Sequence, residues 1–180
     1  MVRWKDDPVR GELLALFGEV DALLSATSCE ASADCCHFER TGREPYPTAV
    51  EIAELEHAIA AGGGFAAFAG SGAGKTSTPK AKLPILGEER RCPLLSAEGR
   101  CRVYASRPFG CRTFFCDRAT GARVSRDRLQ ALGRRVADLS ARAFPRDPGP
   151  RTLESALGAI RRGETVRVQR DIVPPRGRAR

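Results

Sequence analysis

The stretch CEASADCC, at residues 29–36, places three cysteines within eight positions of a 180-residue chain. Four more follow in the middle of the chain, separated by eight, nine and four residues. Clustered thiols in a chain without a secretion signal are typical of metal ligands rather than disulfides, because a reducing compartment keeps thiols free to coordinate. We therefore predict a metal centre. Its candidate ligands are Cys29, Cys35, Cys36, Cys92, Cys101, Cys111 and Cys116.

The spacing of these cysteines does not decide which metal they bind. Thiolates bind zinc, iron and iron–sulfur clusters, but the gaps match neither paired C-x2-C zinc knuckles nor a ferredoxin run. The long, uneven gaps favour an iron–sulfur cluster as the cofactor, with a zinc or iron ion as the alternative. Redox-switching thiols and merely buried thiols are competing interpretations. Because neighbouring side chains diverge, we expect Cys35 and Cys36 to face different surroundings, one of them a second metal or the core.

The first residues indicate a cytoplasmic protein with no membrane insertion. MVRWKDDP, at residues 1–8, contains acids and a proline, and the apolar residues that follow are interrupted by Glu12, Glu19 and Asp21. Neither a signal peptide nor a spanning helix fits this pattern. With 42% apolar residues, the chain is sufficient for a single domain whose modest core a bound metal would supplement.

Positive charge is concentrated in the second half of the chain. The net charge is +8, but residues 1–99 hold ten Lys/Arg against fifteen Asp/Glu, whereas residues 100–180 hold twenty against seven. A basic half can bind nucleic acid, an acidic protein or an anionic membrane surface. Compositional drift toward arginine explains the same asymmetry without any partner, so nucleic acid is a weakly supported partner and a redox or other protein partner stays unidentified.

Apolar periodicity predicts four helices, and hence a mainly α fold with irregular, metal-stabilised cysteine-rich loops. A small α+β content is left open. The helices are expected at residues 11–26, 48–61, 125–144 and 152–163. The second should begin with a capping box formed by Thr48 and Glu51 and bury Val50, Ile52, Leu55 and Ile59; Ser125 should cap the third. Residues 79–115, rich in proline and glycine, should form loops with at most short strands near residues 101–104.

These elements define the expected organisation of the chain. An N-terminal amphipathic helix at 1–27 precedes a cysteine-cluster domain at 28–118, which contains a flexible Gly-rich insertion at about 62–82. C-terminal helices at 119–163 pack on that domain, and a basic tail at 164–180 ends the chain.

AGSGAGKT, at residues 69–76, resembles a phosphate-binding loop that residues 65–68 could precede as a strand. Pro79 and Pro84 interrupt the helix that such a loop requires, so a flexible insertion is the preferred interpretation.

Several cysteine-containing stretches resemble the YkgJ-like cysteine-cluster family, a zinc- or iron-chelating family with a C-x2-C-x2-C-C motif. The resemblance covers roughly residues 28–118 and implies a metalloprotein without a defined reaction, so enzymatic activity is left open. Ser32 occupies the position of the second motif cysteine, and a hydroxyl is a poor ligand for a soft metal. His37 is the nearest group that could replace it. The matching stretches are 29–36, 41–48 with Glu51, 92–95, 99–104 and 107–112.

Two functional hypotheses follow. The first is a metal-binding protein with a redox or metal-handling role. The second is a zinc-stabilised module that binds nucleic acid or an acidic protein through its basic half. In either case, Arg102, Arg107 and Arg112 should offset thiolate charge. Nearby aromatic residues should either shield the centre from water or pack in an ordinary small core; these are Tyr104, Phe109, Phe114 and Phe115.

Overall fold

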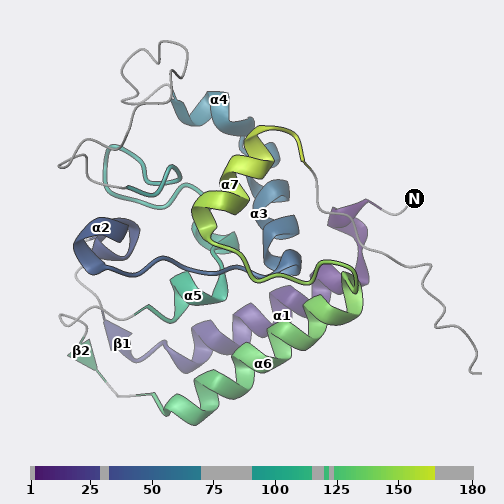
Figure 1. Ribbon diagram of the computed structural model, residues 1–180. Helices are drawn as coiled ribbons and strands as arrows, with labels where there is room; N and C mark the ends of the chain where they lie inside the picture. The colour runs from purple at the N-terminus through teal and green to yellow at the C-terminus, as the bar shows by residue number, and fades with distance from the viewer. Residues whose placement is uncertain (1–2, 29–32, 70–90, 115–119, 122–123, 165–180) are drawn as a thin grey trace, which may run out of the picture.

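Two long helices, α1 (Pro8–Leu23) and α6 (Arg126–Ala143), run antiparallel along one side of the molecule in the computed structural model (Figure 1). The structure describes residues 3–28, 33–69, 91–114, 120–121 and 124–164. Helix α1 begins earlier than predicted, because Pro8 occupies its first turn and the Asp7 side chain accepts the backbone N–H of Val9 at 3.0 Å. The ion pairs Glu19–Arg135 and Glu12–Arg142 follow the antiparallel register.

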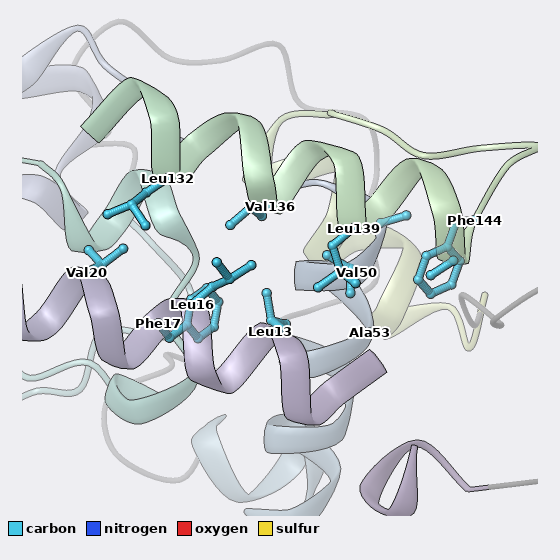
Figure 2. Close-up of a cluster of buried hydrophobic side chains, with 12 residues drawn as sticks. Leu13, Leu16, Phe17, Val20, Val50, Ala53, Leu132, Val136, Leu139 and Phe144 are labelled. Atoms are coloured by element: carbon cyan, nitrogen blue, oxygen red, sulfur yellow. The ribbon is translucent and has the colours of Figure 1, made fainter. Parts of the chain in front are cut away.

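Helix α3 (Ala49–Ala61) crosses this pair and closes the first hydrophobic cluster. Figure 2 shows side chains of α1 meeting those of α6, with Val50 and Ala53 of α3 between them. The apolar residues recur every three or four positions, so each helix presents one continuous apolar face to the others. The largest contributors from α1 and α6 are Leu13, Leu16, Phe17, Val20, Leu132, Val136 and Leu139.

The opposite face of α3 closes a second hydrophobic cluster. Leu55 and Ile59 pack there against helix α7 (Leu153–Arg161), which starts where Thr152 accepts the backbone N–H of Ser155. The remaining buried members are Phe38 and the loop residues Cys92, Leu94 and Val103, with Cys36, Cys101 and Cys111 partly buried against the cluster. Helix α3 is therefore buried on two sides, as expected of a helix that divides two cores.

Short elements connect these helices. The remaining helices are α2 (Phe38–Thr41), α4 (Gly64–Ala69) and α5 (Phe109–Arg112), with the single-turn 3-10 helices η1 (Trp4–Asp6), η2 (Asp34–Cys36) and η3 (Tyr104–Ser106). Strands β1 (Thr27–Ser28) and β2 (Thr120–Gly121) pair antiparallel, with Thr27 opposite Gly121. The mainly α prediction is confirmed: the described residues contain seven α-helices and this two-residue pairing as their only strand ladder.

Several local predictions need correction. Residues 65–68, which a phosphate-binding loop would need as a strand, lie in helix α4, in agreement with the rejection of that interpretation, and most of the stretch 69–76 falls outside the described residues. Ser125 stands at the start of α6, but its side chain accepts no capping hydrogen bond. The predicted loop at 79–115 contains two helical turns, η3 and α5. Most of the insertion at 62–82 and all but the first residue of the tail at 164–180 also fall outside.

No helix in the described ranges is long and apolar enough to cross a membrane.

Candidate metal centre

Five of the seven predicted ligands lie within the described residues, and all five are free thiols. Cys35 and Cys36 belong to η2, Cys92 and Cys101 lie on the loop before η3, and Cys111 is on α5. Cys29 and Cys116 fall outside the described part, as does Ser32.

The thiols from these three segments meet at the edge of the second hydrophobic cluster. The backbone N–H of Cys92 donates to the carbonyl oxygen of Cys36 at 2.8 Å, and an isolated bridge pairs Leu95 with Cys101. The Cys36 thiol is hydrogen-bonded to those of both Cys35 and Cys92. The two neighbours do differ in surroundings, because Cys36 packs against the second hydrophobic cluster and Cys35 is not a member of it, but the turn of η2 still leaves their thiols hydrogen-bonded to each other.

Burial and neighbouring thiols raise the pKa of Cys35, Cys36, Cys101 and Cys111 and so favour their neutral form. For Cys35, the hydrogen bond with Cys36 and then burial raise the pKa well above that of an ordinary thiol. The Cys35 thiol lowers the pKa of Cys36, but the hydrogen bond with Cys92 and burial outweigh this and raise it to about 12. Burial likewise raises the pKa of Cys101, and burial followed by the charge of Cys36 raises that of Cys111.

These thiols are suitable donors for a soft metal once a cation compensates their charge. A metal that binds here must displace protons, because the thiolate is the coordinating form. As the side chains stand, no group of three or more His, Cys, Asp or Glu residues in the described ranges could hold a metal ion. The fit to zinc or iron therefore rests on the chemistry of the donors and on their convergence from three segments.

Among the three arginines expected to offset thiolate charge, Arg107 has the clearest electrostatic influence. Its charge lowers the pKa of Cys35 and Cys101, against the larger effects that raise them. The guanidinium lies 3.9 Å from the ring centroid of Tyr104 and 3.8 Å from a carboxylate oxygen of Asp21. These contacts keep a permanent cation beside the thiols.

Arg112 has a structural task instead. Its side chain is 2% exposed, and it donates to the Asp21 carboxylate at 2.5 Å and to the Arg107 carbonyl at 2.9 Å, with a further hydrogen bond to the carbonyl of Ala105. It also lies 4.1 Å from the Phe17 ring centroid. These bonds fix the turn that leads from η3 into α5, and therefore the position of Cys111.

Glu51 is the clearest residue whose full role the sequence did not reveal. It completes the predicted capping box, accepting the backbone N–H and the hydroxyl of Thr48, both at 2.7 Å. Its other oxygen accepts the backbone N–H of Phe109 at 2.6 Å, where α5 begins. Burial raises the pKa of Glu51, although these N–H donors oppose the shift. One carboxylate thus links the start of α3 to the helical turn that contains Cys111.

Glu54 performs a similar task one turn further along α3. It accepts hydrogen bonds from Trp4 at 2.9 Å, from Arg10 at 2.7 and 3.1 Å, and from the Ser106 hydroxyl at 2.9 Å. Burial alone would raise its pKa, but the bonds from Arg10, Trp4 and Ser106 outweigh this effect and hold the pKa below its usual value. The loop between Cys101 and Cys111 is therefore anchored to α3 at two points.

The other candidate residues have mixed outcomes. His37 is 8% exposed and pairs through its backbone with Arg91, so its role as a replacement ligand stays a prediction. Tyr104 is 61% exposed and offers little shielding. Phe109 packs against the first hydrophobic cluster, away from the cluster that contains the thiols. Phe114 is half-buried, and Phe115 falls outside the described residues.

The helical scaffold and the converging thiols define an α-helical cysteine-cluster domain. A family model of the CxxCxxCC domain, described as "Putative zinc- or iron-chelating domain", matches residues 28–127, which is more than half of the chain. The chain belongs to this family, as the resemblance over 28–118 predicted. No curated protein and no solved structure was found to match it.

Proposed function

We propose that this chain holds an iron–sulfur cluster through its clustered cysteines and serves in electron transfer or metal handling. The main support is the proximity of thiols that are distant in sequence, since Cys36 of η2 is hydrogen-bonded to Cys92, and Cys101 and Cys111 pack against the same hydrophobic cluster. When bound, such a cluster would supply one-electron redox chemistry. The protein would supply thiolate ligands, the cation of Arg107 and a partly apolar surround.

The number of available thiols favours a cluster over a single ion. A structural zinc ion takes four ligands in a tetrahedral arrangement, whereas four thiols lie at the second hydrophobic cluster, Cys35 adjoins them, and Cys29 and Cys116 are further expected ligands. Apolar neighbours and the nearby Arg107 are the kinds of surroundings that tune a cluster potential. A reducing compartment such as the cytoplasm would keep these thiols available.

The test is iron, zinc and acid-labile sulfide analysis with a visible spectrum, on protein purified without oxygen. Iron with matching sulfide and broad visible absorbance is expected. Cys101→Ser and Cys111→Ser should each lower metal content, whereas the exposed Ala105→Ser in the same loop should not. Zinc without sulfide would refute the cluster, and unchanged metal content in both cysteine variants would refute their role as ligands.

A second function is supported by charge on α6. Arg135 and Arg142 are paired with carboxylates of α1, but Arg126, Arg128 and Arg134 are exposed and form no ion pair with the described residues. In this alternative, a zinc-stabilised module uses these exposed arginines to bind nucleic acid. Binding to duplex or single-stranded DNA that weakens steeply with salt, and weakens further when the unpaired arginines are replaced by glutamine, would support it; salt-independent or absent binding would refute it.

A further inference from the structure

A surface pocket of about 460 Å³ lies between the segment after α2 and the end of α5. Residues 42–46 form one wall, and Gly110 and Phe114 form the other. Figure 1 shows the chain from α2 passing α5 on its way to α3. Gly110 directly precedes Cys111, so the pocket shares a wall with the candidate metal centre.

The first wall is held from behind by backbone hydrogen bonds. The Pro45 carbonyl accepts the N–H of Leu153 at 2.9 Å, and the Pro47 carbonyl accepts that of Arg151 at 3.2 Å. The second wall approaches closely at Gly110, where an added Cβ would lie 3.3 Å from the Cβ of Pro45. The pocket is therefore shaped by fixed main chain, as ligand sites usually are.

The side chains around this pocket combine two aromatic rings with one available cation. Tyr46 is 62% exposed, and Phe114 is half-buried. The guanidinium of Arg43 lies 5.8 Å from the Phe114 ring centroid and has no carboxylate partner among the described residues. Glu44 also lines the pocket, but its carboxylate accepts the backbone N–H of Glu154 at 2.7 Å in the first turn of α7.

We propose that this pocket binds a planar ring that carries an anionic group, with the ring against Phe114 and Tyr46 and the anion at Arg43. Aromatic side chains contact flat ligands over a large area, and arginine pairs with carboxylate or phosphate through two parallel donors. A nucleotide and an aryl carboxylate both offer this chemistry. The proposal uses only the pocket residues, so it holds whichever metal occupies the neighbouring centre.

The test is isothermal titration calorimetry on the full chain as purified. The probes are adenosine monophosphate and 4-hydroxybenzoate, with adenosine, 4-hydroxybenzamide and inorganic phosphate as controls. At least one of the two ring anions should bind more tightly than its neutral analogue and than phosphate. Binding of the nucleotide alone, of the carboxylate alone, or of both identifies the source of the anion, and each of these outcomes supports the proposal.

Variants locate the binding site. Arg43→Gln should weaken binding by on the order of tenfold, because a charge-assisted hydrogen bond is lost. Phe114→Leu should weaken binding of both the anionic and the neutral ring. Arg3→Gln removes the same charge from an exposed side chain at the start of η1 and should have no effect. The proposal would be overturned if neither ring anion binds at concentrations up to about 1 mM. Equal losses of affinity in both arginine variants would overturn it as well.

Discussion

Replacing Glu51 with glutamine tests whether a buried carboxylate holds the turn that contains Cys111. Glu51 is 2% exposed and accepts two backbone N–H groups, one on each oxygen, from Thr48 and Phe109. Glutamine has the same shape, but only one of its two terminal atoms can accept. Its NH2 group must therefore face one of these N–H donors, at the start of either α3 or α5.

The structure sets the size of the expected effect. A buried donor left without an acceptor costs about 1–3 kcal/mol, and a bond to a charged acceptor lies toward the upper end. Removing a buried charge offsets part of this, because the desolvation that raises the pKa of Glu51 disappears with the charge. We expect a net loss of about 2 kcal/mol in the free energy of unfolding, or a melting temperature lower by roughly 4–8 °C for a chain of this size.

Urea denaturation, with metal analysis of the same samples, measures this effect. The control is Glu12→Gln, which removes a carboxylate from an exposed ion pair with Arg142 and should cost at most about 1 kcal/mol. Metal content should fall with stability in Glu51→Gln and stay unchanged in the control. If Glu51→Gln loses no more stability than Glu12→Gln, the Glu51 carboxylate does not hold the start of α5 in place.

Three further changes test other parts of the scaffold. The pKa of Glu54 is lower in the folded state than its unfolded value of about 4.3, so the ionised carboxylate stabilises the fold above that pH. This contribution is lost as the pH falls through the lower folded pKa. The difference in urea midpoint between wild type and Glu54→Gln should therefore be large at neutral pH and shrink in acid. Gly149→Ala, at φ +77° with an added Cβ 3.1 Å from the Ala49 nitrogen, should be more destabilising in thermal melts than Gly163→Ala, which has φ +76° and open space. Leu139→Ala, at a residue 2% exposed in the first hydrophobic cluster, should cost about 2–5 kcal/mol by chemical denaturation.

The long helices could be predicted because their signals are local. Apolar spacing predicted a helix at 125–144, where α6 lies, and the capping box of α3 predicted its start within one residue. Helix α5 could not be predicted in this way. It is a single turn whose first N–H is satisfied by Glu51, a residue 58 positions earlier in the chain.

The candidate site was predictable in composition more than in geometry. Cysteine spacing identified the thiols and the family, but it did not reveal that a 3-10 turn leaves the Cys35 and Cys36 thiols hydrogen-bonded to each other. The Glu54 hydrogen bonds to Trp4, Arg10 and Ser106 join three separate elements to α3. Such contacts depend on how the helices pack, so no local pattern of sequence reveals them.

The two hydrophobic clusters differ in their relation to the cysteines. The cluster between α1, α3 and α6 contains no cysteine among its described members, whereas the second includes Cys92 and partly buries Cys36, Cys101 and Cys111. A metal bound by these cysteines would therefore stabilise the second cluster and the loops that Glu51 and Glu54 anchor. Helix α3 forms a wall of both clusters, so its carboxylates couple a core that packs without thiols to loops that depend on them.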